Sequence, residues 1–399
     1  MVSSELEDCA WLVSPAGQSQ LELAADRSPL PPAAIRSLRQ KIGNNRTHLV
    51  LEQLELRRRA RPKFSQAQRM FFSERLLEQS TEDLIADYKA RRFPAGARIA
   101  DLCTGIGGDL MGLARRGWTV AIDRNPLAIR LARANCEAVG VAAAGFVMAD
   151  ATQTNLSRFD AWHIDPDRRS GGGRSSRPEL SDPGTDALEK LLEQQPSAAM
   201  KLAPAAVLPE QWRQLAELEW VGTRRECRQQ IAFFGSLART PGRHTATVLD
   251  HAGVAFSFTG TPDQEPEVDE TAGSFVYEPH AALLASHLAG HFAMEHGLRA
   301  LARRVAYYTS NRRISTPLAA GFEVIDVLPL DRRRLKQTLR SKGIGQLEVK
   351  VRGVPIDPQV LAKQLRGPGS ESATVLIASL KRGVTAVLAK RLGEVTPVS

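Results

Sequence analysis

The stretch ARIADLCTGIGGDL, residues 97–110, decides the fold class. Its first residues form a short apolar run that ends near Asp101, and Gly105, Gly107 and Gly108 then lead into a helical pattern. Glycines let the backbone approach a ligand closely, and the free amides at a helix start favour a carboxylate or a phosphate. The stretch therefore predicts a ligand-binding loop that follows the first strand of an α/β sheet.

Further apolar runs lie on the C-terminal side of this loop. They are TVAID (119–123), GFVMAD (145–150), DAWHID (160–165) and AAMKLA (198–203), and helix-like segments such as 126–140 separate them. Strands that alternate with helices predict a parallel, doubly wound sheet, so the fold class is α/β and Rossmann-like. The later runs 228–237 and 244–250 have no helix between them, and they predict an antiparallel pair that completes the sheet.

The periodicity divides the chain into five regions. We expect a helical N-terminal region over 1–92, the α/β domain over 93–257 and an acidic, Pro/Gly-rich linker over 258–274. A helical connector is predicted over 275–320, and a small α+β domain over 321–399.

Composition limits the possible partners and compartments. The 399 residues carry a formal charge of +9, which favours a polyanion such as nucleic acid, although a basic protein without such a partner is the alternative. The four cysteines are far apart in the sequence and predict neither disulfides nor a metal site. The first residues lack a signal-peptide pattern and no run has membrane-spanning length, so we expect a cytoplasmic protein without a membrane partner.

Two cofactor classes compete for the glycine loop. A dinucleotide fingerprint starting at Gly105 would require glycine at position 110, where the chain has Leu110, and it does not explain Asp101. The pattern acid-x-x-x-Gly-x-Gly instead resembles the class I S-adenosylmethionine-dependent methyltransferases. The resemblance implies S-adenosyl-L-methionine as the cofactor, held by the following residues: Asp101, Thr104, Gly105, Gly107, Gly108, Asp123 and Asp150.

The acids at the second and third strand ends have specific roles in such a site. The resemblance implies that Asp123 accepts the ribose hydroxyls of the cofactor and that Asp150 faces the adenine amino group. Aspartates at strand-to-helix turns also cap helices, so capping is the alternative interpretation for each of them. Gln79, Ser80 and Thr81 precede the sheet and either close over the methionine end of the cofactor or cap a helix.

The fourth strand ends in IDPDRR, residues 164–169, beside the expected position of the transferred methyl group. This run resembles the Asp-Pro-Pro-type motif of RNA and amino-methylating members, but Asp167 replaces the second proline and Arg168 stands where an aromatic residue is expected. The substitution argues against methylation of a base amino group. A carbon-5 pyrimidine mechanism needs a cysteine near this turn, and the sequence has none between Cys136 and Cys227.

The same turn supplies the candidate catalytic group. Asp165 is positioned to orient or deprotonate an acceptor, and the predicted substrate-binding residues are Pro166, Arg168, Arg169 and Lys201. Arg174 and Arg177 could also hold phosphates. A solvated basic loop is the alternative for the arginines, and a lysine with a buried stem is the alternative for Lys201.

Residues 60–399, with runs such as KLAP and YEPHAALLA, resemble bacterial methyltransferases that carry a THUMP-like C-terminal domain. THUMP domains bind RNA, so the resemblance implies an RNA methyltransferase. The alternatives are an RNA-binding protein that retains a cofactor pocket, and a methyltransferase with a protein or small-molecule substrate. Basic residues crowd the terminal segment and agree with an RNA partner: Arg332, Arg333, Arg334, Lys336, Arg340, Lys342, Lys350 and Arg352.

Overall fold

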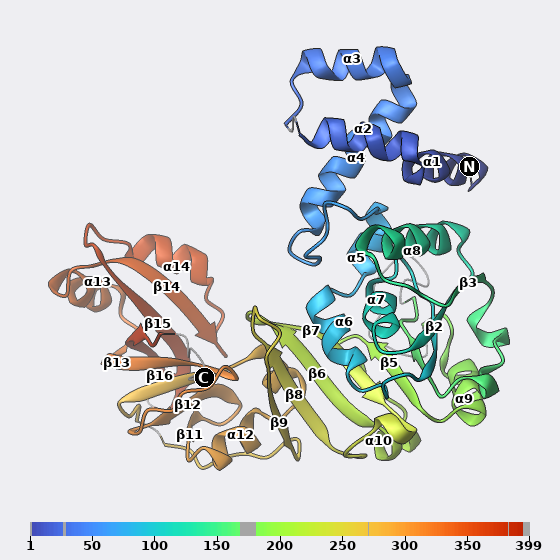
Figure 1. Cartoon of the computed structure of the whole chain (residues 1–399). Coiled ribbons are helices and arrows are strands. Elements are labelled where there is room, and N and C mark those ends of the chain that lie inside the picture. Colours follow the sequence, from blue (N-terminus) through green and yellow to red (C-terminus); the bar gives the residue numbers. More distant parts are fainter. Residues whose placement is uncertain (1, 27–28, 168–180, 270, 382, 394–399) are drawn as a thin grey trace. The chain divides into compact units, whose positions relative to one another are not determined.

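The computed structural model describes all residues except 1, 27–28, 168–180, 270, 382 and 394–399 (Figure 1). The chain forms two compact units, and each is described by itself. The first unit comprises Met1–Glu217 and Gln230–Gly242, and the second comprises Leu218–Gln229 and Arg243–Ser399. Within the described residues, no helix combines the length and the apolar character needed to cross a membrane.

Helices fill the first part of the first unit, where the sequence predicts them. Their bounds are α1 Val2–Val13, α2 Pro15–Ala25, α3 Pro32–Ile42, α4 Asn44–Ala60, α5 Glu74–Gln79 and α6 Asp83–Ala90. Local signals set two of the boundaries. The Ser14 side chain accepts a hydrogen bond from the Gly17 amide at the start of α2, and Gly43, with φ of 82°, separates α3 from α4.

The N-terminal helices share a hydrophobic core with the α/β part of their unit. Leu21, Val50 and Phe71 belong to the same buried cluster as Leu131 of α8 (Pro126–Val139). A buried side chain also joins the two parts by hydrogen bonds. Asn135 on α8 accepts from the Phe71 amide at 2.7 Å and donates to the Phe71 carbonyl at 3.1 Å. The helical region is therefore part of the first unit and not a separately folded lead-in.

The sheet of the first unit has the strand order β3-β2-β1-β4-β5-β7. The bounds are β1 Arg98–Leu102, β2 Trp118–Asp123, β3 Gly145–Met148, β4 Ala161–Ile164, β5 Ala198–Leu202 and β7 Glu226–Phe233, of which only the part from Gln230 on belongs to this unit. Strands β1 to β5 are parallel. The order reverses direction between β1 and β4, which makes this the position where an open α/β sheet binds its ligand. The predicted doubly wound α/β class is confirmed.

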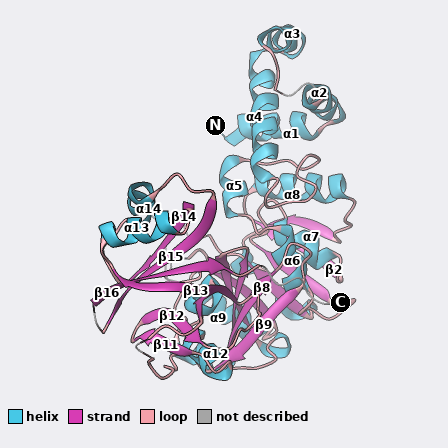
Figure 2. Ribbon diagram, turned by 90° about the vertical axis from the view of Figure 1, so that its left-hand side faces the viewer, coloured by secondary structure: helices cyan, strands magenta, loops and turns pink. Residues whose placement is uncertain are grey.

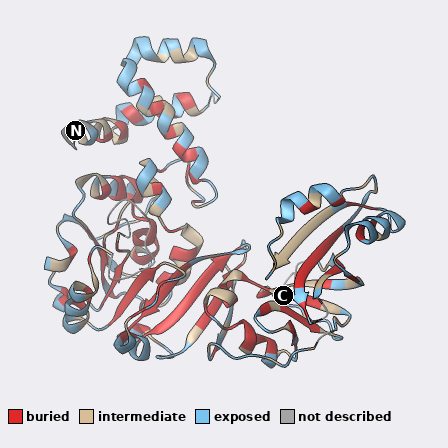
Figure 3. Ribbon diagram, turned by 180° about the vertical axis from the view of Figure 1, so that it is seen from behind, coloured by how far each residue is buried: buried red, intermediate tan, exposed pale blue. Residues whose placement is uncertain are grey.

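Helices cover this sheet and bury its central strands. The remaining helices of the unit are α7 Gly108–Ala114, α9 Thr185–Gln194 and α10 Glu210–Leu215, with the short 3-10 helices η1 Ala151–Gln153, η2 Leu156–Arg158 and η4 Gly235–Leu237. Figure 3 shows that buried residues gather along the strands of the sheets. Strands β4 and β5 are buried along their whole length. Such continuous burial is typical of parallel strands that are covered on both faces.

The second unit contains the strands β6 Glu217–Thr223, β8 His244–Leu249 and β9 Ala255–Gly260, apart from the first residue of β6, and a seven-stranded sheet (Figure 2). The order of that sheet is β11-β12-β10-β13-β16-β15-β14, and only β14 and β15 pair in parallel. The strands of this sheet and the helices between them are β10 Phe275–Pro279, α11 Ala281–Ala285, α12 Ala289–Glu295, β11 Arg299–Ala302, β12 Val305–Ser310, β13 Ala319–Pro329, α13 Arg332–Ser341, β14 Ile344–Arg352, α14 Pro358–Leu365, β15 Glu371–Leu380 and β16 Gly383–Arg391.

Two sequence-based expectations about this region are wrong. The helical connector over 275–320 contains the short helices α11 and α12, but β10, β11 and β12 are strands of the seven-stranded sheet. The Ala- and Leu-rich spacing is ambiguous over such short runs, and pairing with neighbouring strands decides the outcome. The linker over 258–274 also begins inside β9, because residues 255–260 pair with β8.

The antiparallel pair predicted for 228–237 and 244–250 is replaced by other pairings. β7 runs antiparallel to β5, whereas β8 runs parallel to β6 and antiparallel to β9. Residues 217–223 form β6, which the sequence analysis did not predict.

The predicted terminal domain over 321–399 does not stand alone in its unit. Strand β13 pairs with β10 as well as with β16. Val276 and Tyr307 lie in one buried cluster with Phe322 and Leu376. A truncation before residue 321 would therefore expose this core.

Candidate active site

The glycine loop and the Asp165 turn leave neighbouring strands at the point where the sheet order reverses. In the register of β1 and β4, Asp101 lies beside His163 and Leu102 lies beside Ile164. The Asp165 amide then donates to the Leu102 carbonyl at 3.4 Å. Because both segments leave the carboxyl ends of their strands, the structure brings them together at the expected ligand site.

Different structural features explain why the positions of the loop are occupied by glycine. Gly105 and Gly107 have φ of 56° and 84°, values that favour glycine, and a side chain added at Gly105 would meet open space. A Cβ at Gly108 would instead lie 2.8 Å from the Thr81 carbonyl oxygen. Gly108 is thus explained by close packing, whereas the open side of the loop lies at Gly105.

Asp123 at the end of β2 holds the loop from the other side. Its carboxylate accepts the Gly105 amide at 3.0 Å and the Asn125 amide at 2.8 Å, one on each oxygen. Burial raises its pKa, and these two amides oppose that effect. Each carboxylate oxygen has a further lone pair, so the group can accept additional donors.

Asp150 is exposed and caps η1. The Thr152 amide donates to its Oδ1 at 2.8 Å and the Thr152 hydroxyl at 2.9 Å, and these hydrogen bonds lower the pKa of the carboxyl. The capping interpretation is observed for this residue. Its second oxygen is a place where a ligand amino group could bind.

Asp101 and Thr104 are both buried and bind each other. The Thr104 hydroxyl donates to Asp101 Oδ2 at 2.5 Å, while Asp101 Oδ1 lies 2.7 Å from Nδ1 of His163. Both oxygens of Asp101 therefore have protein partners. The acid that the methyltransferase pattern requires fixes the start of the glycine loop in this structure.

A buried polar chain continues from His163 into the N-terminal helices. His163 Nε2 lies 2.7 Å from Lys89 Nζ, and the same nitrogen of Lys89 lies 2.7 Å from Asp109 Oδ1. The Thr81 hydroxyl donates to Asp109 Oδ2 at 2.7 Å. Burial lowers the pKa of Lys89. Burial acts to raise the pKa of Asp109, but nearby positive charge, chiefly that of Lys89, outweighs that effect, so the pKa of Asp109 is lowered.

Sequence reasoning missed this chain, which we call the Lys89 network: Thr81, Lys89, Asp101, Asp109 and His163. A polar signal existed, since His163 interrupts an otherwise apolar strand and Asp109 directly follows the glycines. The contact itself joins residues far apart in the sequence, and only the folded chain reveals it.

Asp165 forms an ion pair with Lys201 at the ends of β4 and β5. Asp165 Oδ2 lies 2.5 Å from Lys201 Nζ, which also donates to the Gln79 carbonyl at 3.0 Å. The Lys201 side chain is 6% exposed and that of Asp165 is 21% exposed. Asp165 is therefore accessible, and its carboxylate has a fixed position.

The rest of the turn is anchored by α5. Arg75 lies 2.6 Å from Asp167, and the Gln79 amide donates to Asp167 at 3.0 Å. Pro166, predicted to bind substrate, is buried. The predicted phosphate contacts Arg168, Arg169, Arg174 and Arg177 lie outside the described residues. Elsewhere among the described residues, no group of three or more His, Cys, Asp or Glu is arranged to hold a metal ion.

Comparison with known proteins assigns the chain to a family. The chain is 30% identical over 368 residues to uncharacterized S-adenosylmethionine-dependent methyltransferases of Mycobacterium tuberculosis strains CDC 1551/Oshkosh and ATCC 25618/H37Rv, covering 87% of this chain and 96% of each relative. It belongs to the S-adenosylmethionine-dependent methyltransferases. The cofactor is S-adenosylmethionine, which confirms the prediction from the glycine loop.

Two further comparisons agree with the domain organisation. The THUMP domain-like family matches residues 319–391, close to the predicted terminal domain. A crystal structure from Porphyromonas gingivalis W83, provisionally assigned as a methyltransferase, superposes with a TM-score of 0.76 at 21% identity and covers 98% of this chain and 99% of its own. The two proteins therefore share their fold over nearly the whole length.

One cysteine does lie near the Asp165 turn. Cys103 directly follows β1, and its pKa is raised well above the ordinary value by burial and by the negative charges of Asp123 and Asp165. A thiol with a raised pKa is a poor nucleophile, because the thiolate is the reactive form. The sequence argument that no cysteine lies near the turn is therefore wrong, and the raised pKa of Cys103 is what weighs against a carbon-5 mechanism.

Proposed function

We propose that this methyltransferase modifies RNA, with the donor at the Gly105 loop and the acceptor beside Asp165. The ion pair of Asp165 with Lys201, beside the point where the sheet order reverses, is the observation that supports the acceptor position, and the exposed cations of α13 support RNA as the substrate class.

The residues around the loop fit an S-adenosylmethionine molecule. We propose that the ligand approaches the backbone on the open side of Gly105. The ribose hydroxyls donate to the remaining lone pairs of the Asp123 carboxylate. We assign to the uncapped oxygen of Asp150 the adenine amino group. Asp101, Thr104, Gly107 and Gly108 act by shaping the loop.

S-adenosylmethionine supplies an activated methyl group whose transfer forms a bond from the acceptor atom to carbon and breaks the sulfur–carbon bond. The acceptor must lose a proton or expose a lone pair during this step. Asp165 is positioned to accept a hydrogen bond from the acceptor, or its proton, because Lys201 and the Gln79 carbonyl fix the carboxylate. The geometry suits a ring N–H or an O–H acceptor, in agreement with the sequence argument against a base amino group.

The second unit supports RNA as the substrate class. Helix α13 carries the exposed cations Arg332, Arg333, Arg334, Lys336 and Arg340, and no acid occurs between residues 332 and 347. Lys350 and Arg352, which belong to the same predicted set, form ion pairs with Glu278 at 2.6 and 3.2 Å. We therefore assign the phosphate contacts of the THUMP-like region to α13. A cytoplasmic location remains the prediction from the sequence.

The test is transfer of labelled methyl groups from S-adenosylmethionine to total RNA, taken from a strain that lacks the protein. We expect wild-type protein to label RNA, and Asp165→Asn to bind the cofactor normally but to transfer about 10²–10⁴-fold more slowly. Asp160→Asn is the matched control, since Asp160 is exposed at the other end of β4 and pairs with Arg98. A wild-type protein that labels protein or small molecules but no RNA would overturn the RNA assignment.

A further inference from the structure

The N-terminal helices contain a second basic surface that the catalytic site does not use. Residues 27–51 include no Asp or Glu, but they include Arg36, Arg39 and Lys41 on α3 and Arg46 on α4. All four are exposed. Among the described residues none of them has an ion-pair partner, in contrast to Arg58 further along α4, which pairs with Glu55 at 2.6 Å.

Folding of the first unit accounts for Arg46, whose guanidinium lies 4.9 Å from the centre of the Trp11 ring, but it does not account for Arg36, Arg39 and Lys41. Helix α3 has no buried residue, and it is held only through partly buried side chains such as Leu38 and Ile42. Figures 1 and 2 both show α3 at the end of the helical region that is farthest from the sheet of its unit. A helix that contributes so little to the core and presents unpaired positive charge has the character of a binding surface.

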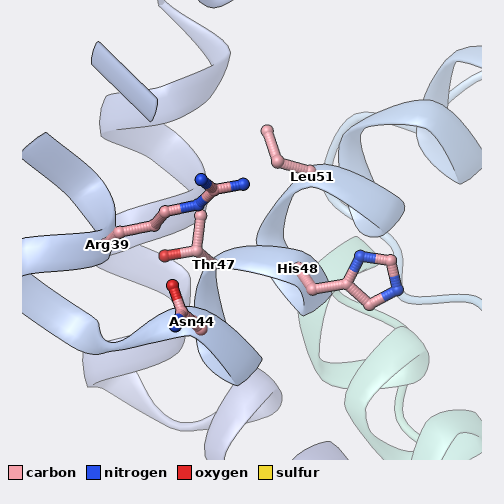
Figure 4. A pocket seen from close by; sticks show the side chains of 5 residues that line it. All are labelled: Arg39, Asn44, Thr47, His48 and Leu51. Atoms are coloured by element: carbon pink, nitrogen blue, oxygen red, sulfur yellow. The ribbon is translucent and has the colours of Figure 1, made fainter. Parts of the chain in front are cut away.

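A pocket lies where α3 meets α4. It has a volume of about 330 Å³ and is lined by Arg39, Asn44, Thr47, His48 and Leu51. Figure 4 shows the guanidinium of Arg39 extending from α3 toward Thr47. The lining offers hydrogen-bond donors and a positive charge, and only one of its five side chains, Leu51, is aliphatic. The pocket therefore suits a phosphate group better than an apolar ligand.

We infer that α3 and the start of α4 bind the phosphate backbone of the RNA substrate. The inference rests on the proposed RNA substrate and adds a second contact region, distinct from α13. Residues 29–51 contain no Phe, Tyr or Trp, so the contact is made chiefly by charge and does not read base sequence. The pocket takes one phosphate, and Arg36 and Lys41 contact its neighbours.

The first experiment measures how RNA affinity depends on salt. The probe is a fluorescein-labelled single-stranded RNA of mixed sequence, and the triple variant is Arg36→Gln/Arg39→Gln/Lys41→Gln. We expect the slope of log K against log salt to become shallower by about 0.7 for each phosphate that the variant no longer neutralises. The control is Arg58→Gln/Arg59→Gln/Arg115→Gln, which removes exposed cations that already pair with carboxylates and should leave the slope unchanged.

The second experiment adds one negative charge inside or outside the pocket. Asn44 and Asn45 both lie in the first turn of α4, but only Asn44 lines the pocket. An aspartate is favourable to a helix start at either position, so folding is preserved. We expect Asn44→Asp to weaken RNA binding at least about fivefold more than Asn45→Asp at low salt, where phosphate contacts dominate affinity.

The outcomes separate this inference from the proposed function. If wild-type protein methylates RNA but the triple variant keeps the wild-type slope, the inference is wrong and the RNA assignment stands. If Asn44→Asp and Asn45→Asp weaken RNA binding equally, the pocket does not take part in the RNA contact. A wild-type protein that does not bind the RNA probe and labels no RNA would overturn both. Calorimetric titration with S-adenosylmethionine, expected to be unchanged in every variant, verifies that each protein is folded.

Discussion

The ammonium nitrogen of Lys89 lies 2.7 Å from Nε2 of His163, although 74 positions separate the two residues in the sequence. Lys89 comes from the helix before the sheet, and His163 comes from the strand that leads to Asp165. When Lys89 is charged it can only donate, so Nε2 accepts and the Nδ1 hydrogen points to Asp101. The Lys89 network thereby ties α6 to both strands that flank the candidate active site.

Removing Lys89 should therefore destabilise the first unit strongly. Lys89→Met leaves Asp109 as a buried carboxylate without its partner, and we expect a loss of about 3–5 kcal/mol in the free energy of unfolding. Urea denaturation measures this loss. Lys190→Met, on the exposed side of α9, is the control and should change stability by less than about 0.5 kcal/mol.

The double variant Lys89→Met/Asp109→Asn tests the mechanism of that loss. It should recover part of the stability, because the unpaired charge is then gone. Equal stability of the single and double variants would mean that the ion pair is not the source of the effect.

Asp123 should be essential for binding the methyl donor. Its replacement by alanine removes the acceptor of two backbone amides and the proposed acceptor of the ribose hydroxyls. Because a hydrogen bond to a charged group contributes roughly 1.5–3 kcal/mol, Asp123→Ala should weaken S-adenosylmethionine binding by at least about tenfold. Isothermal titration calorimetry measures this, with Asp160→Ala as a control at an exposed carboxylate. Unchanged affinity of Asp123→Ala would exclude the ribose role.

The strand-end acids of the site could be predicted from the sequence, because each follows directly from a local apolar run. Asp101, Asp123 and Asp165 lie at the ends of β1, β2 and β4, where alternation of strand and helix predicts them. The Lys89 network could not be predicted, since no local pattern shows that a lysine of α6 meets a histidine of β4. The functional candidates were thus visible, but the residues that hold them in place were not.

The fold shows the same division between local and distant information. Repeated strand–helix alternation predicts the parallel strands, because each unit of that pattern is local. Strands β10, β11 and β12 are only four to six residues long, and the helical pattern of the segments between and beside them conceals them. They become strands through pairing with residues up to 48 positions away, as Phe275 does with Glu323. Sequence periodicity cannot register such partners.

Acid should destabilise the second unit through His280. The ring is buried, its Nδ1 accepts the Ala282 amide at 3.0 Å, and its Nε2 lies 3.0 Å from the Arg224 carbonyl, so the neutral form caps α11. Burial lowers the pKa of His280 below its ordinary value of 6.5. Between the two pKa values the unfolded state binds more protons, so stability falls as pH decreases from about 6.5 toward the folded pKa.

Replacement of His280 by Asn tests whether protonation of this histidine causes the loss of stability in acid. Asn caps a helix start but does not titrate, so His280→Asn should show a smaller loss of stability between pH 7.5 and pH 5 than wild type. The measurement is urea denaturation at several pH values. A variant with the same pH dependence as wild type would assign the acid sensitivity to other groups.

Alanine at two glycine positions of the loop should affect protein stability and cofactor binding to different degrees. A methyl group at Gly108 would approach the Thr81 carbonyl oxygen to 2.8 Å, so Gly108→Ala must displace the start of α7 and should cost about 1–3 kcal/mol in the free energy of unfolding. A methyl group at Gly105 meets no protein atom within 4 Å, and its cost to folding is limited to the strain at φ of 56°, about 1–2 kcal/mol. The added methyl group would, however, occupy the side of the loop that we assign to S-adenosylmethionine. Gly105→Ala should therefore lose cofactor affinity by a larger factor than Gly108→Ala, even where their melting temperatures are similar. Thermal melts recorded beside calorimetric titrations compare the two variants, and an intact affinity in Gly105→Ala would place the cofactor elsewhere.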